Sequence, residues 1–97
     1  MKVGEIGVKL IFSLKKDDGS PFDLTEATEA FIHFKLKGTT WVKPCVIDKK
    51  NNIVYYEIAE DDNLQEGVLS MEVEIRFIDG STVLKSNTIT ERIYPSF

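Results

Sequence analysis

Carboxylates are the side chains whose type and spacing come closest to a chemical site in this chain. They gather in two short segments, which hold Asp17, Asp18 and Asp23, and then Glu60, Asp61 and Asp62. Loop carboxylates are ligands that Ca²⁺ prefers, so each segment is a candidate for weak calcium binding. Neither segment has the D-x-D-x-D-G spacing of a calcium loop. We therefore predict solvated turn residues at both places, with no metal ion and no cofactor.

Few residues could carry nucleophilic catalysis. The chain has one cysteine, Cys45, and one histidine, His33. A catalytic thiol or serine needs a basic partner, and His33 falls in the middle of a strand-like run, away from any loop. Cys45 cannot form a disulfide within the chain, and we interpret it as a small apolar side chain that is buried or half-buried. Because phosphate-loop, Rossmann and zinc spacings are also absent, we predict a protein without catalytic residues that is not an enzyme.

The charge balance argues against two classes of partner. The 97 residues carry 12 basic and 16 acidic side chains, whereas nucleic-acid binders are normally basic. The longest apolar runs are too short to span a membrane, and Met1–Glu5 does not open a signal peptide. We expect neither a nucleic acid nor a membrane as partner. We predict one domain over residues 1–97, with residues 1–7 as a lead-in that is ordered only where a partner holds it.

Apolar residues recur at every second position along most of the chain, which is the pattern of half-buried strands. The expected inward faces are centred on residues such as Phe12, Phe34, Tyr56 and Val73. The runs lie at Val8–Lys15, Glu29–Leu36, Thr39–Ile47, Ile53–Ile58, Val68–Phe77 and Thr82–Tyr94. The last run is long for one strand, so we expect a bend at Ser86-Asn87 to divide it in two.

The third of these runs has an ambiguous register. A lysine belongs in water, so Lys43 favours a register with Val42 and Val46 inside and Trp41 outside. Pro44 has no N–H to donate to a neighbouring strand. We therefore expect this run to be an edge strand or to carry a bulge at Pro44.

The segment Glu60–Gly67 is the one place that favours a helical turn. Asp62 and Gln65 have the spacing of a capping box, and Gly67 fits the left-handed residue that ends a helix. Leu64 would attach this turn to the core. The segment is long enough only for a turn across one end of the fold.

Short strands separated by regular turns predict an all-β fold. Asp79-Gly80, directly after a clean strand pattern, is a strong hairpin signal. We predict an immunoglobulin-like antiparallel β-sandwich of about seven strands with one short helical turn. The Cys…Trp…Cys spacing of antibody domains is absent, so the prediction concerns architecture alone.

Three aromatic residues could form a contact surface. If the second, third and fourth runs are neighbouring strands, Phe31, Trp41 and Tyr55 all fall on the outer face. Exposed aromatic residues on one face are a candidate patch for a partner protein or a sugar. The alternatives are that a strand register slips by one residue, or that a loop covers the patch.

One long stretch also carries a family resemblance. In GVKLIFSLKKDDGSPFDLTEAT, followed by FIHFKLKGTT, a strand of the form LxFxL leads into a D-G-x-P-x-D-L-T-x-A corner and later a Gly-Thr-Thr turn. The matching residues are Leu10, Phe12, Leu14, Asp18, Gly19, Pro21, Asp23, Leu24, Thr25, Ala27, Phe34, Gly38, Thr39 and Thr40, with Tyr56, Asp61, Leu64, Gly67, Asp79 and Gly80 in the second half. The pattern resembles the N-terminal immunoglobulin-like domain of baseplate upper proteins from phages of Gram-positive bacteria.

The resemblance implies a structural role in a virion. Members of that family anchor the host-recognition apparatus to the tail tip, assemble as oligomers with other baseplate proteins and have no catalytic residues. It implies a tail or baseplate module that acts by protein–protein contact and is made in the host bacterial cytoplasm without a signal peptide. The matched residues are turn and core positions, so we expect the Asp18–Leu24 corner to be structural and to bind no ligand.

Two other functions remain open. One is a carbohydrate-binding or adhesion module that contacts host cell-wall glycans through Trp41. The other is a generic immunoglobulin-like domain of the kind appended to bacterial enzymes or adhesins.

Overall fold

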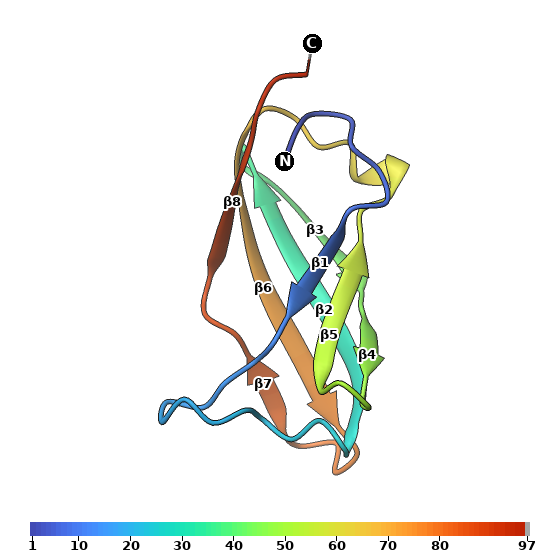
Figure 1. Ribbon diagram of the computed structural model, residues 1–97, viewed down its shortest axis with the longest axis vertical. Helices are drawn as coiled ribbons and strands as arrows, with labels where there is room; N and C mark the ends of the chain where they lie inside the picture. Colours follow the sequence, from blue (N-terminus) through green and yellow to red (C-terminus); the bar gives the residue numbers. More distant parts are fainter. Residues whose placement is uncertain (97) are drawn as a thin grey trace.

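The computed structural model describes residues 1–96 and has two antiparallel β-sheets packed face to face (Figure 1). The elements are β1 (Lys9–Phe12), β2 (Ala27–Leu36), β3 (Thr39–Pro44), β4 (Val46–Asp48), β5 (Ile53–Glu57), the 3₁₀ turn η1 (Glu60–Asp62), β6 (Gly67–Phe77), β7 (Val83–Lys85) and β8 (Ile89–Ile93). The predicted all-β sandwich with one short helical turn is confirmed. No helix within residues 1–96 is long and apolar enough to cross a membrane.

The pairing order has the immunoglobulin arrangement. One sheet has the order β1-β5-β4; in the other, β3, β2 and β6 are neighbours, and β7 and β8 both pair with β6. This matches the B-E-D and C′-C-F-G sets of the immunoglobulin fold. The first strand, β1, therefore takes the place of strand B of that fold.

The lead-in, residues 1–7, is held by the chain itself. Lys2 lies parallel to Tyr94, where the Val3 N–H donates to the Tyr94 carbonyl at 2.9 Å. The Gly7 N–H donates to the Ile58 carbonyl at 2.8 Å. This segment is therefore bonded, without any partner, to the residues that directly follow β5 and β8.

The core lies between the sheets and comes from the alternating residues of each strand. Ile32, Val54, Leu69 and Val73 are fully buried. Every inward residue predicted for β2, β5 and the first part of β6 is buried, and Phe77 at the end of β6 is half-buried. The alternation of apolar residues predicted these inward positions correctly because each of these strands has one face in the core.

The predicted run Thr39–Ile47 is two strands, and its register is the reverse of the prediction. The chain leaves the larger sheet after Pro44, at the end of edge strand β3, and joins the smaller sheet as β4. Trp41 faces the interior, while Val42 and Val46 are each 51% exposed. Lys43 misled the prediction because its stem lies on the inner side while its ammonium reaches carboxylates at the end of the sandwich.

The helical turn occurs inside the predicted segment but with different caps. Ala59 precedes η1 as its N-cap, and Asp62 is the last residue of η1, not its cap. Asn63, with φ of 47°, supplies the left-handed residue that was assigned to Gly67. Leu64 is buried, as predicted.

The last predicted strand is divided at the expected place. Ser86 donates its N–H to the Val73 carbonyl, and Ile89 pairs with Met71. Asn87 and Thr88 therefore both lie opposite a single β6 residue, which is the geometry of a β-bulge. The β6–β7 hairpin is closed by Asp79, whose Oδ1 accepts the N–H groups of Ser81 and Thr82 at 3.0 and 2.8 Å.

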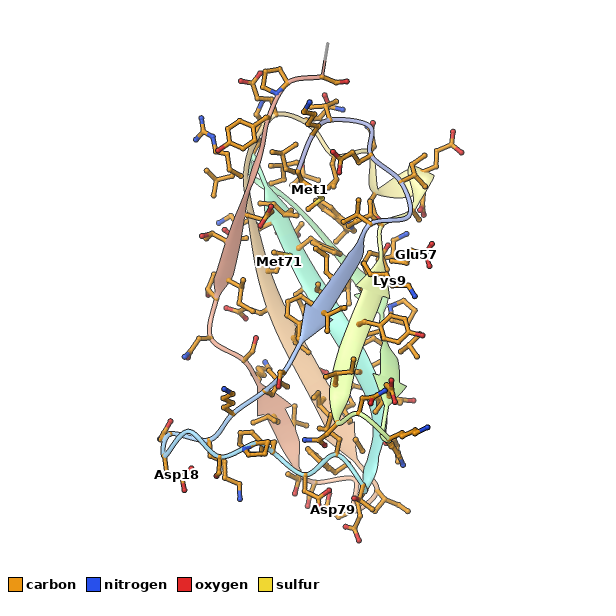
Figure 2. All side chains as sticks on the ribbon, viewed as in Figure 1. Met1, Lys9, Asp18, Glu57, Met71 and Asp79 are labelled. Atoms are coloured by element: carbon orange, nitrogen blue, oxygen red, sulfur yellow. The ribbon has the colours of Figure 1, made fainter. Side chains whose placement is uncertain are left out.

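Residues 13–26, which we call the arm, project from one end of the sandwich, with Asp18 at the tip (Figure 2). The base of the arm is held by Asn52. Its Nδ2 donates to the Phe22 carbonyl at 2.6 Å, and its Oδ1 accepts the Leu24 N–H at 3.0 Å. Leu24 is buried and thereby attaches the arm to the core.

Candidate functional site

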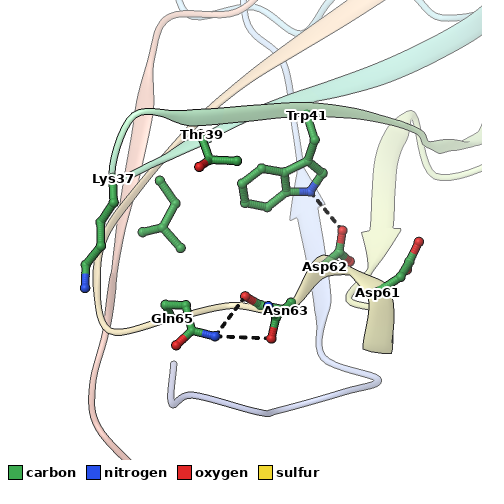
Figure 3. Close-up of a pocket in the computed structure, with 8 residues that line it drawn as sticks. Lys37, Thr39, Trp41, Asp61, Asp62, Asn63 and Gln65 are labelled. Carbon is green, nitrogen blue, oxygen red and sulfur yellow. Dashed lines mark hydrogen bonds between the residues drawn. The ribbon is translucent and has the colours of Figure 1, made fainter.

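The most densely bonded polar group is the carboxylate of Asp62, whose side chain has no exposed surface. Trp41 Nε1–H donates to Oδ1 at 2.9 Å (Figure 3). Tyr56 O–H donates to Oδ2 at 2.5 Å. The Ala59 N–H adds a third donor at 2.8 Å. The Lys43 ammonium lies 3.7 Å from Oδ1 and supplies positive charge. This buried carboxylate is thus fully hydrogen-bonded.

The local backbone explains why Asp62 points inward. Residues of a 3₁₀ turn are spaced at about 120° around its axis, so three consecutive acids point in three directions. Glu60 and Asp61 face solvent, and Asp62 turns under the end of the sandwich. We call Asp62 with Trp41, Tyr56 and Lys43 the Asp62 cluster.

Electrostatics within the Asp62 cluster follow from these contacts. Burial, reinforced by the hydrogen bond to Asp62, raises the pKa of Tyr56 well above its ordinary value. The Lys43 ammonium donates to Asp61 Oδ2 at 2.6 Å, which lowers the pKa of Asp61 and raises that of Lys43. Through these contacts the cluster joins β3, β5 and η1.

An open hollow lies beside the Asp62 cluster at the same end of the sandwich. It has a volume of about 460 Å³ and is lined by Leu36, Lys37, Thr39, Trp41, Asp61, Asp62, Asn63 and Gln65 (Figure 3). The Trp41 ring stacks on Phe34, with centroids 5.0 Å apart and planes at 22°. The Gln65 amide donates to Asn63 Oδ1 at 3.1 Å. An aromatic ring beside several polar side chains can receive a polar ligand.

The structure does not bring Phe31, Trp41 and Tyr55 onto one surface, so the expected shared face is wrong. Trp41 faces the interior. Phe31 is on the outer side of β2, where it lies opposite Glu74 of β6. Tyr55 is on β5, in the other sheet. The prediction failed because it reversed the register of β3 and treated strands of different sheets as neighbours.

Phe31 instead belongs to a charged network on the outer face of the larger sheet. The Arg76 guanidinium lies 5.0 Å from the centroid of the Phe31 ring, and its Nε donates to Glu74 Oε2 at 2.8 Å. His33 Nε2 lies 3.2 Å from the other oxygen of Glu74. Burial would raise the pKa of Glu74, but these bonds outweigh it and the pKa is lowered. The network covers Phe31 and satisfies a buried carboxylate.

Tyr55 belongs to an apolar row that the sequence analysis did not find. Ile11 pairs with Tyr55, and Tyr55 pairs with Val46, so the three side chains lie across the outer face of the smaller sheet. Ile11 is 60% exposed. Lys9 Nζ lies 5.2 Å from the centroid of the Tyr55 ring, at the margin of the row. The available signal was Ile11, which interrupts the outward polarity of its strand. We call Ile11, Tyr55 and Val46 the apolar row.

The loop carboxylates accept hydrogen bonds from residues of their own turns. Asp18 accepts the Ser20 hydroxyl at 2.6 Å, and Asp23 accepts the Thr25 hydroxyl at 2.5 Å. These bonds lower the pKa of both carboxyls. Within residues 1–96, no group of three or more His, Cys, Asp or Glu side chains is placed to hold a metal ion.

The side chains of Cys45 and His33 lie on opposite faces of the larger sheet, Cys45 on the core side and His33 on the outer side. Cys45 is half-buried against the core, and burial raises the pKa of its thiol to about 12. His33 is on the outer face with Glu74. The two side chains therefore do not form a nucleophile–base pair.

Comparison with known proteins identifies no relative: no family model, curated protein or solved structure matches the chain.

Proposed function

We propose that this protein is a structural module of a phage tail or baseplate and acts by protein–protein contact during assembly of the host-recognition apparatus. The observation that carries the contact is the apolar row on the smaller sheet. The placement in a tail rests on the resemblance of residues 7–28 and 31–40 to the baseplate upper proteins. The proposal includes no catalytic role, in keeping with what that resemblance implies.

The apolar row has the character of a small interface core. Ile11 and Val46 are exposed, and the aromatic Tyr55 lies between them. Aromatic residues are enriched in the parts of interfaces that lose water on binding. Lys9 and Glu57, which face each other beside the row, provide a charged rim of both signs.

The rest of the molecule suits a rigid support for this surface. The sheets share a continuous core, the turns are closed by their own side chains, and the lead-in is bonded to Tyr94. A rigid scaffold loses little conformational entropy when it binds. The proposed partners are other tail or baseplate proteins in an oligomeric virion assembly.

Co-purification with the products of neighbouring genes tests this proposal. Proteins from a tail operon should co-purify with the wild-type chain, and Ile11→Ser with Tyr55→Ser should weaken the complex by roughly tenfold or more. Ile78→Ser with Val68→Ser is the matched control, because these apolar residues are also exposed but lie outside the apolar row. The proposal fails if the neighbouring genes are metabolic, or if both double variants behave alike.

A second candidate function is glycan binding in the hollow beside Trp41. The specific observation is that an aromatic ring and the polar side chains of Thr39, Asp61, Asn63 and Gln65 line one open space. Trp41 is the single tryptophan of the chain, so tryptophan fluorescence reports on the surroundings of this residue. Saturable change in its emission on adding wall polysaccharide, weakened in Gln65→Ala, would favour this function. An emission that does not change would remove it.

A further inference from the structure

A second exposed surface lies along the seam between the two sheets, far from the apolar row in the pairing order. A groove of about 580 Å³ separates the arm from the region of β7 and the β-bulge. Figure 1 shows the arm extending past β7 at this end of the molecule. Its floor is apolar, with Leu14 and Phe22 on one side and Leu84 and Ile89 on the other.

On the side of β7 and β8, the floor of the groove consists of side chains from the inner face of the larger sheet that remain partly exposed to solvent. Leu84 pairs with Ile75, and Ile89 pairs with Met71, so both side chains are on the inner face of the larger sheet. Ile89 is nevertheless 37% exposed. The cause is the topology, since β1 pairs with β5 and β8 pairs with β6, but the sheet pairing does not join β1 to β8. Residues 1–3 meet this seam at the C-terminal part of β8, where Met1 bonds to Glu91 and Arg92 and Val3 bonds to Tyr94.

The edge of β7 offers free hydrogen-bonding groups to the groove. Phe77 donates to Thr82, and Ser86 donates to Val73, which places Leu84 in the hydrogen-bonded register with β6. In an antiparallel pair the intervening residues direct their N–H and C=O groups away from the partner strand. For β7 these residues are Val83 and Lys85. Their peptide groups therefore face the side on which the groove lies.

The rim of the groove is positively charged. Lys15, Lys16 and Lys85 line it together with one carboxylate, Asp17. The chain as a whole has a formal net charge of −4, so the local charge at the groove is opposite in sign to the net charge of the protein. The arrangement complements a ligand that carries carboxylates outside and apolar side chains inside.

We propose that this groove binds an extended, acidic segment of another polypeptide, which adds to the free edge of β7. Main-chain bonds to Val83 and Lys85 would fix the segment, as in other cases of strand addition. Alternate apolar side chains would cover Leu84 and Ile89, and alternate carboxylates would meet the lysines. This site is separate from the apolar row, so it can exist whether or not the row makes the assembly contact.

Fluorescence anisotropy with a labelled peptide that alternates Glu with Val tests the proposal. The peptide should bind saturably to the wild-type chain, and the amide resonances of Val83 and Lys85 should shift in nuclear magnetic resonance spectra. Lys15→Glu with Lys85→Glu should weaken binding by roughly tenfold, because two favourable contacts become repulsive. Lys35→Glu with Lys50→Glu changes the net charge equally at exposed positions outside the groove and should bind like the wild type.

Two probe peptides separate strand addition from simple attraction of charge. Polyglutamate lacks the apolar side chains, and a Glu-Val peptide with alternate N-methylated amides cannot pair along its main chain. Both should bind much more weakly than the parent peptide. The proposal is overturned if the parent peptide does not saturate, if either probe binds equally well, or if the two lysine double variants bind alike. Circular dichroism establishes that both variants are folded.

Discussion

Three consecutive acids, Glu60, Asp61 and Asp62, have three different environments. Glu60 is exposed, Asp61 forms an exposed ion pair with Lys43, and Asp62 is buried under Trp41 and Tyr56. In the sequence they form one acidic segment. Three adjacent acids do not reveal which of their side chains points into the core. The 3₁₀ turn assigns those directions. A position that resembles a solvated charge is thus the polar centre of one end of the fold.

Replacing Asp62 by Ala should destabilise the protein by about 2–4 kcal/mol, because Trp41 and Tyr56 would keep buried donors without an acceptor. The free energy of unfolding from a urea titration measures this effect. Asp61→Ala is the matched control, one residue away and exposed, and should leave the value nearly unchanged. Equal effects of the two substitutions would show that the Asp62 cluster does not support the fold.

Cys45 should react slowly with thiol reagents in the native protein. The thiolate is the reactive form, and a pKa of about 12 leaves little of it at neutral pH. Reaction with a chromogenic disulfide should become much faster once denaturant exposes the residue and restores an ordinary pKa. Equal rates in the native and unfolded states would contradict the burial of Cys45.

At the scale of elements, the sequence was sufficient wherever one face of a strand lies in the core. The inward residues of β2, β5 and most of β6 follow period two, and the division of the last strand occurs at Ser86-Asn87. The sequence was insufficient where a strand changes sheets. Along β3 and β4 both faces carry apolar residues, so the pattern around Lys43 and Pro44 does not determine which side is inner.

The candidate surfaces were less predictable than the strands for a related reason. Each depends on which strands are neighbours, and the alternation within a strand does not contain that information. Tyr55 was recognised as an outward residue, but its neighbours Ile11 and Val46 follow only from the pairing of β1, β5 and β4. The groove likewise depends on β1 and β8 remaining unpaired.

The arm depends on Asn52, a residue with φ of 55° whose amide bonds to Phe22 and Leu24. Asn52→Gly keeps the left-handed backbone accessible but removes both bonds, and should cost about 1–2 kcal/mol. Hydrogen exchange at the Leu24 N–H should accelerate. Asn63→Gly is the control, because Asn63 is also left-handed and its amide forms no bond to the arm. Slow exchange at Leu24 in Asn52→Gly would disprove the role of Asn52.

The whole molecule should lose stability in acid. Within residues 1–96, the pKa values of six carboxyls are lowered in the folded state, namely those of Asp18, Asp23, Asp48, Asp61, Glu74 and Asp79. Below the unfolded pKa values, at roughly pH 4, the unfolded chain therefore binds more protons than the folded one. The free energy of unfolding should fall between about pH 5 and pH 2. A constant or rising value over this range would contradict the bonds described for these carboxyls.

In an assembled tail, we expect another protein to cover the outer face of the smaller sheet, centred on the apolar row. Hydroxyl-radical footprinting of the free chain and of the assembled particle measures this directly. Oxidation of Ile11 and Tyr55 should fall strongly on assembly, while Ile78, which is 71% exposed on the β6–β7 hairpin, should be oxidised as before. Unchanged oxidation of Ile11 and Tyr55 in the particle would contradict the claim.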